Sequence, residues 1–313
     1  MNMHEWPLTF FTTFGQMAVG AFFVLGVITM VGRTRYSANA INRICVPALY
    51  AIGPIMIAGF CLAFFHLGNP LNALNVMRHI SSSGLTQELV GGCIFAALGF
   101  LFAACQFFDW GSVGTRTTIA VITAIAGIGF IATMARLYML PTIPSWNHWT
   151  TPAAFYLSAA VTGLLAIAVA LTAYNWLEDS ELIKKLIPSA RNEDQTDAQK
   201  EEVWDLIHAS LRWIGIALTV VVPLIFIVMV FNYGRPAGPN PAQFEFNMTA
   251  FVIRIGLLLV GAFIVGLILA FGGRTRRPTS SAMLWITVAY ILVVIAEMLG
   301  RFMFYGAVDR IGI

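Results

Sequence analysis

Charged side chains are scarce in this sequence. Only 11% of its 313 residues are Asp, Glu, Lys or Arg, whereas 58% are hydrophobic. A soluble domain carries about a quarter charged residues, so the composition excludes an ordinary pair of soluble domains. The net charge of +3 is small and the basic residues form no single block, so no nucleic-acid partner is expected.

Residues that commonly hold redox centres are also sparse. The four cysteines, Cys45, Cys61, Cys93 and Cys105, lie in apolar runs and form no C-x-x-C pair, so we interpret them as small buried residues. Of the five histidines, only His66 adjoins a long apolar run, and a transmembrane b-type haem usually takes two facing histidines. There is no Gly-x-Gly-x-x-Gly, Walker loop or metal-ligand cluster. We therefore predict no haem and no metal in this protein.

Long apolar runs are abundant. Each is roughly 21–24 residues long, and about 20 apolar residues suffice for a helix to cross the hydrocarbon core. The runs lack the strict alternation of polar and apolar residues expected of a barrel strand. We therefore predict an all-α integral membrane protein, with eight transmembrane helices forming a bundle in one domain, residues 1–313. The runs are residues 8–31, 44–65, 88–108, 117–139, 152–174, 211–231, 249–271 and 282–304.

The loops between the runs differ in charge. Basic residues next to transmembrane helices stay in the cytoplasm, and twelve lie on one side of the predicted bundle against three on the other. We therefore expect an inner-membrane protein with both termini in the periplasm. The twelve are Arg33, Arg35, Arg43, Arg116, Lys184, Lys185, Arg191, Lys200, Arg212, Arg274, Arg276 and Arg277; the three are Arg78, Arg235 and Arg310.

One sizeable polar insert, residues 175–210, separates the fifth and sixth runs. It holds nine acidic and four basic residues, so it is not a polybasic lipid-binding segment. We expect a cytoplasmic helical hairpin that faces solvent or a partner.

Six ionisable side chains lie inside or at the edge of the runs, and a charge at mid-bilayer costs about 2.5–3.5 kcal/mol. They are His66, Glu88, Arg136, Arg254, Glu297 and Arg301. With the topology above, all six fall in the outward-facing half of the membrane, which indicates one polar pocket. A histidine and a carboxylate can each accept a proton. Such a pocket suits a substrate that loses protons on oxidation, such as a quinol.

These residues also have structural interpretations. Glu297 and Arg301 are four residues apart on one helix face and can neutralise each other. Arg136 and Arg254 can extend to lipid headgroups. The histidine can cap a helix end, and Glu88 can favour the N-terminus of its helix, where negative charge is stabilised.

Several short blocks follow one another along nearly the whole sequence. They are His4-Glu5-Trp6-Pro7-Leu8, Phe14-Gly15-Gln16, His66-Leu67-Gly68-Asn69-Pro70, Thr86-Gln87-Glu88-Leu89, Arg136-Leu137-Tyr138, Trp149-Thr150-Thr151-Pro152, Arg254-Ile255, Glu297-Met298-Leu299-Gly300-Arg301 and Phe304-Tyr305-Gly306. Together and in this order, they resemble the membrane-anchor subunit of bacterial dimethyl sulfoxide reductase, the quinol-oxidising component of a molybdenum enzyme complex.

The resemblance implies eight helices, no haem, and a histidine and a glutamate in menaquinol oxidation, which match His66 and Glu88. Candidate quinol-binding residues are Arg136, Arg254, Glu297 and Arg301. It also implies a heterotrimer in anaerobic respiration, in which this protein is not catalytic alone. The expected partners are an iron–sulfur subunit with [4Fe–4S] clusters and a catalytic subunit with molybdopterin guanine dinucleotide. Because electrons tunnel efficiently only over short distances, we expect these partners on the periplasmic face, near the quinol.

Two departures leave the partner and its substrate open. The 175–210 insert is longer and more charged than the resemblance implies, and the proline-rich loop at residues 233–246 matches no recognised pattern. One alternative is the anchor of a polysulfide, tetrathionate or selenate-type reductase. Another is a secondary transporter, although such proteins usually carry their charges near the midplane on broken helices, and only Pro223 suggests a break here. A third is a purely structural anchor.

Overall fold

The computed structural model describes residues 6–66, 83–174, 196–234, 247–272 and 279–307. This part of the protein is all-helical, and eight of its helical segments are long and apolar enough to cross a membrane, as predicted. The helices are α1 (Trp6–Gly32), α2 (Ala38–His66), α4 (Gly84–Phe107), α5 (Val113–Tyr138), α6 (Thr150–Thr172), α9 (Asp197–Tyr233), α10 (Met248–Leu258), η6 (Leu259–Ile264), α11 (Val265–Phe271) and α12 (Ser280–Gly306).

Polar caps determine where several helices begin. The side chains of Ser83, Ser112, Asn247 and Thr279 each accept a hydrogen bond from a backbone N–H in the first turn of the helix that follows. Such caps satisfy N–H groups that have no partner within the helix. The helices therefore start a few residues before the apolar runs that predict them.

The largest departure from the expected boundaries is at α9. This helix begins at Asp197, after a capping box formed by Thr196 and Gln199, and not near residue 211. The second half of the predicted insert is thus a continuous extension of a transmembrane helix, and not a separate hairpin arm. Ser37 fixes the extension, because its N–H and hydroxyl donate to the two oxygens of Glu202 at 2.6 and 2.7 Å. Residues 175–195 lie outside the described residues, and a cytoplasmic location for the insert stays a prediction.

The seventh span is interrupted, contrary to the expectation that Pro223 marks the best candidate for a break. Pro223 lies within continuous α9, whereas Leu259–Ile264 forms a π-helical turn, η6, between α10 and α11. A π-turn adds a residue, and one residue corresponds to about 100° around a helix. The two halves therefore present different faces: α11 packs mainly against α9, and α10 packs against α12.

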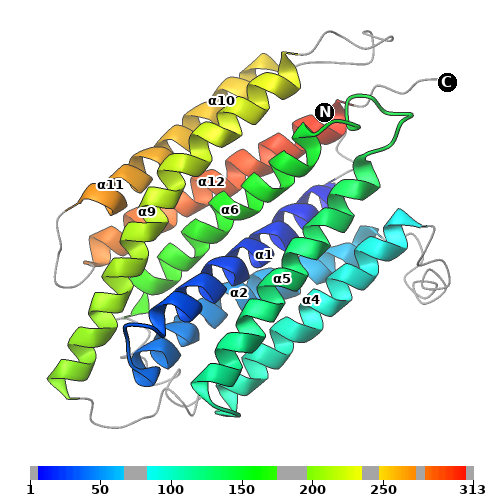
Figure 1. The fold of residues 1–313 in the computed structure, drawn as a ribbon. Coiled ribbons are helices and arrows are strands. Elements are labelled where there is room, and N and C mark those ends of the chain that lie inside the picture. The colour runs from blue at the N-terminus through cyan, green and yellow to red at the C-terminus, as the bar shows by residue number, and fades with distance from the viewer. Residues whose placement is uncertain (1–5, 67–82, 175–195, 235–246, 273–278, 308–313) are drawn as a thin grey trace.

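The first helix is the centre of the bundle. Figure 1 shows α1 between α2, α5 and α6, with α4 at one edge of the bundle and α10 and α11 at the other. Helices α1, α4, α6 and α10 begin at the same end of the bundle, where α2, α5, α9 and α12 finish. We call this the Glu88 end, and the opposite end the Arg116 end.

A glycine crossing holds α1 against α6. A Cβ atom added to Gly20 would lie 1.8 Å from the carbonyl oxygen of Ala159, and one added to Gly163 would lie 2.2 Å from the carbonyl carbon of Gly20. Small residues let transmembrane helices approach closely, which increases their van der Waals contact. The contact requires glycine on both helices.

Gly20→Ala is therefore expected to prevent correct folding, because the added methyl group overlaps backbone that cannot move aside. The matched control is Gly129→Ala in α5, where an added Cβ would have no neighbour within 4 Å. The yield of monodisperse protein after mild detergent extraction measures the effect. A Gly20→Ala yield equal to that of Gly129→Ala would contradict the crossing.

Candidate functional site

All six predicted site residues belong to the Glu88 half of the bundle. Glu88 is the fifth residue of α4, and His66 is the last residue of α2, although its side chain lies outside the described part of the structure. Arg254 is the seventh residue of α10, and Glu297 and Arg301 are in the second half of α12. The structure thus agrees with their predicted placement toward one end.

Glu88 is buried although it lies near a helix end. Its side chain is 4% exposed, and its Oε1 atom has no hydrogen-bond partner among the described residues. A buried polar atom without a partner costs free energy, so a functional explanation is needed.

The ion pair in this region joins α10 to α12. Arg254 Nη2 lies 3.2 Å from Glu297 Oε1 and 3.4 Å from Oε2, and both side chains are buried. The guanidinium occupies the space above Gly300, where a Cβ atom would lie 2.4 Å from Arg254 Cζ. Glycine on α12 therefore makes room for the arginine.

Arg301 has a different environment from that expected from its spacing to Glu297. Its Nη2 donates to Gln16 Oε1 of α1 at 2.7 Å, and its Cζ lies 3.7 Å from the ring centroid of Phe155. No ion pair between Arg301 and Glu297 is found among the described residues. The predicted pairing of Glu297 and Arg301 along one helix face is thus replaced by a pairing between helices, and Arg301 is a second buried cation near a single carboxylate.

Two buried tyrosines meet at the same end of the bundle. The hydroxyl of Tyr305 is 3.1 Å from that of Tyr138 and 3.2 Å from Thr12 Oγ1, and all three side chains are buried. These contacts link α12 to α5 and to α1.

An aromatic layer covers these groups at the Glu88 end. Trp146, in the loop between α5 and α6, stacks on Phe304 with ring centroids 5.3 Å apart, and its Nε1 donates to the Phe304 carbonyl at 2.8 Å. The Thr151 hydroxyl donates to the Trp146 carbonyl at 2.6 Å, which fixes the loop to the start of α6. The tryptophan also packs edge-on against Tyr138. Its ring centroid is also 6.3 Å from that of Tyr305, so the loop packs on the tyrosine pair.

A small cavity is lined in part by Arg301. Its volume is about 40 Å³, and a water molecule needs roughly 10–15 Å³ of such volume, so it can hold about three. Its polar lining comes from Asn232, Tyr233, Arg254, Glu297 and Arg301. The apolar lining comes from α6, α9 and Phe304.

The structure thus brings Arg254, Glu297 and Arg301 together around one cavity among α6, α9, α10 and α12, and Glu88 on α4 is not part of its lining. The Arg136 side chain is exposed on α5 and does not line the cavity. Contact of these side chains with a quinol stays a prediction.

The polar residues of this region that are absent from the predicted site include Gln16, Tyr138 and Tyr305. A search restricted to charged side chains misses them because they are neutral. Each nevertheless lies in one of the blocks that carry the resemblance, and Gln16 is a buried amide within an apolar helix.

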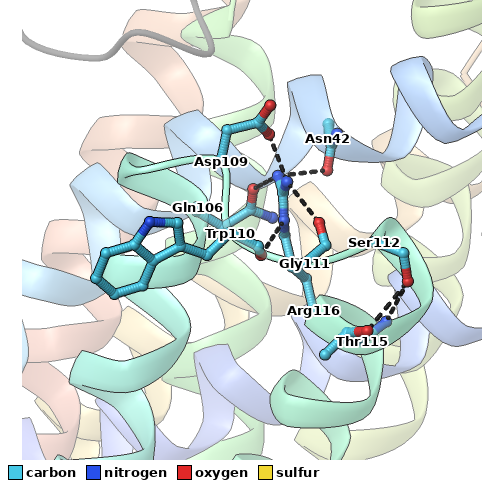
Figure 2. Close-up of polar contacts among 8 residues, drawn as sticks. All are labelled: Asn42, Gln106, Asp109, Trp110, Gly111, Ser112, Thr115 and Arg116. Carbon is cyan, nitrogen blue, oxygen red and sulfur yellow. Dashed lines mark hydrogen bonds and ion pairs between the residues drawn. The ribbon is translucent and has the colours of Figure 1, made fainter.

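A polar cluster at the Arg116 end provides a contrast. Figure 2 shows Arg116, in the first turn of α5, with its five N–H donors facing five acceptors around the turn between α4 and α5. The acceptors are the backbone carbonyls of Trp110 and Gly111 and the side chains of Asn42, Gln106 and Asp109. A fully satisfied arginine stabilises the turn and leaves no donor for a ligand. In contrast to this arginine, Glu88 Oε1, Gln16 Nε2 and Arg254 Nε at the other end have no hydrogen-bond partners in the described residues.

The cysteines are only partly as predicted. Cys45 and Cys105 are buried, but Cys61 and Cys93 are exposed on α2 and α4. These two positions lie on outward faces of helices in a protein whose exposed surface is largely apolar, so the interpretation of all four as buried is wrong for them. In the described residues all four thiols are free.

Eight apolar spans with buried ionisable side chains near one end define a multi-pass helical membrane protein. The protein belongs to the DMSO reductase anchor subunit (DmsC) family, whose model matches residues 1–189. The resemblance seen in the sequence is thereby confirmed.

Curated relatives extend this match. An anaerobic dimethyl sulfoxide reductase chain from Escherichia coli (strain K12) is 33% identical over 163 residues, which span 52% of the present sequence and 56% of that protein. Its namesake from Haemophilus influenzae is 28% identical over 309 residues, spanning 97% and 95%. A sulfite dehydrogenase subunit from Allochromatium vinosum is 27% identical over 141 residues, spanning 40% and 43%.

Proposed function

We propose that this protein is the membrane anchor and menaquinol-oxidising subunit of a dimethyl sulfoxide reductase-type complex in the inner membrane. The observation that carries the proposal is Glu88, a buried carboxylate with an unpartnered oxygen at the end of the bundle where α2 finishes with His66. Family membership supports the role of anchor. The site chemistry supports the quinol.

Quinol oxidation removes two protons and two electrons, and a protein site must accept the protons. Glu88 Oε1 is an available acceptor, and the histidine is a second one. Arg254 and Arg301 place positive charge in the same half of the bundle, which favours oxygen atoms that lose protons. An acceptor pair beside buried cations is thus suited to deprotonating a quinol hydroxyl.

The electrons removed from the quinol would pass to partner subunits. An iron–sulfur subunit with [4Fe–4S] clusters would dock at the Glu88 end and pass electrons to a subunit that holds molybdopterin guanine dinucleotide. Because the basic loop residues favour a cytoplasmic Arg116 end, the partners are proposed to lie in the periplasm. Protons released from the quinol would then appear on the side where the acceptor is reduced.

Two alternative functions would retain different parts of this proposal. An anchor of another molybdenum enzyme, such as a polysulfide, tetrathionate or selenate reductase, would keep the quinol site and change the acceptor. The similarity to a protein named as a sulfite dehydrogenase subunit supports this alternative. A secondary transporter is less favoured, because η6 remains helical and the cavity lies toward one end.

Purification of the tagged protein from anaerobically grown cells, with mass spectrometry of what accompanies it, tests the proposal. The expected result is an iron–sulfur and a molybdopterin subunit, and menaquinol-dependent reduction of dimethyl sulfoxide in liposomes. Reduction of another acceptor would indicate the related anchor. Transport activity of the protein alone, with no redox partner, would contradict the proposal.

A further inference from the structure

We propose that the cavity lined by Arg254, Glu297 and Arg301 binds a small monovalent inorganic anion such as chloride. This inference goes beyond the proposed function and does not rest on it, because Glu88 is not part of the cavity lining. It gives a ligand to a pair of buried arginines whose charges the protein itself balances only in part.

The charges around the cavity are unequal. Arg254 and Arg301 are both buried, at 8% and 3% exposure, and Glu297 is the only acidic residue in the described lining. Glu297 is already paired with Arg254 at 3.2 Å. Arginine keeps its proton in proteins, so one positive charge is left without a carboxylate among the described residues. A buried charge without a counter-charge is costly inside a membrane, and a bound anion would offset that cost.

Unused hydrogen-bond donors accompany the excess charge. A guanidinium carries five N–H donors. Among the described residues, Arg301 donates one hydrogen bond, from Nη2 to Gln16 Oε1 at 2.7 Å, and Arg254 Nε donates none. The Tyr233 hydroxyl and the Asn232 amide, which can also donate, belong to the same lining. A lining rich in donors favours a ligand that only accepts hydrogen bonds, and an anion is such a ligand.

Packing fixes both guanidinium groups beside the cavity. Arg254 fills the space above Gly300, where a side chain would overlap its guanidinium. The Cζ atom of Arg301 lies 3.7 Å from the ring centroid of Phe155, which covers one face of the guanidinium. Groups held in this way need little reordering when a ligand binds, which favours binding.

The volume of the cavity limits the size of the ligand. A cavity of about 40 Å³ holds about three water molecules. A halide ion is only slightly larger than a water molecule, so one ion fits together with water, and its single charge matches the single excess positive charge. The lining includes Tyr233, the last residue of α9, and Ala154, the fifth residue of α6, so the cavity lies close to the Glu88 end.

The test measures chloride binding to the tagged protein, purified in mild detergent and exchanged into gluconate, a bulky anion. Wild-type protein should bind radioactive chloride saturably, with one ion per protein. Its melting temperature should rise by about 2 °C or more when chloride replaces gluconate at constant ionic strength, because a ligand of the folded state stabilises it. Arg301→Gln should lose both effects. The matched control Arg136→Gln, which removes an exposed arginine outside the cavity, should keep both.

A second variant keeps the test decisive if Arg301→Gln does not fold. Ala154→Leu should also abolish chloride binding, because the larger side chain would fill the cavity while both arginines stay in place. Absence of saturable binding in the wild-type protein, or equal binding in a folded Arg301→Gln or Ala154→Leu variant, would overturn the proposal. Displacement of chloride by a menaquinol analogue would also overturn it and would assign the cavity to the quinol. Because binding is measured without turnover, its failure is distinguishable from failure of the quinol site at Glu88.

Discussion

Glu88→Gln is expected to lower menaquinol-dependent turnover of the complex by about 100-fold or more. The amide keeps the shape of the side chain but cannot accept the quinol proton, and general-base catalysis typically contributes about 10²–10⁴-fold. Turnover with an artificial dye that reduces the catalytic subunit directly should not change. His66→Leu is expected to have the same selective effect, since the histidine is proposed as the second acceptor.

The control for this prediction is Glu202→Gln at the Arg116 end. Glu202 is a half-buried carboxylate that binds Ser37, so it tests whether loss of any glutamate lowers activity. It should retain full quinol-dependent turnover. Equal loss of dye activity in Glu88→Gln would indicate failed assembly, and full quinol activity would contradict a role for Glu88.

Glu297→Leu is expected to produce the second large effect, a loss of about 3–5 kcal/mol of stability, because Arg254 would be left buried without its carboxylate. The pair is deep, since Glu297 lies nine residues before the end of α12, or about 14 Å along the helix. Thermal denaturation of the purified complex in detergent measures the effect. An unchanged melting temperature would show that Arg254 does not depend on this partner.

The double variant Arg254→Met/Glu297→Leu distinguishes a structural role of the ion pair from a role in quinol binding. Replacing a whole buried ion pair by apolar residues is often neutral or stabilising, so most of the stability should return. If the pair also contacts the quinol, as predicted, quinol-dependent turnover should stay low although the complex is stable. Recovery of both properties would give the pair a structural role alone.

Hydrophobicity is sufficient to predict the transmembrane spans, because a lipid environment demands long apolar helices whatever their neighbours are. All eight spans are therefore confirmed, with ends that differ by a few residues where Ser, Thr or Asn caps extend them. The extension of α9 is different. Its packing depends on Ser37 and on Gly32 at the end of α1, which are remote in sequence, so its polar composition suggests a separate helical hairpin and not a continuation of the span.

The π-turn in the seventh span could not be predicted for a similar reason. Gly261 lies where an added Cβ would be 2.8 Å from the carbonyl oxygen of Ala289 in α12. That close approach depends on packing between helices. The local sequence, Leu259 to Ile264, is uniformly compatible with an ordinary α-helix.

The sequence is sufficient to predict where the buried charged side chains lie, but not which of them form an ion pair. The cost of charge in a membrane marks Glu88, Arg254, Glu297 and Arg301 by composition alone. Spacing along α12 suggests that Glu297 pairs with Arg301, yet the structure pairs it with Arg254. Partners on other helices depend on rotation about each helix axis, which a single sequence does not specify.

The most direct measurement is photoaffinity labelling of the complex with an azido-menaquinone, followed by mapping of the labelled peptides. A quinol site at the Glu88 end predicts labels near the end of α2 and the start of α4 that excess menaquinol prevents. Labels confined to the Arg116 end, near the turn between α4 and α5, would contradict it.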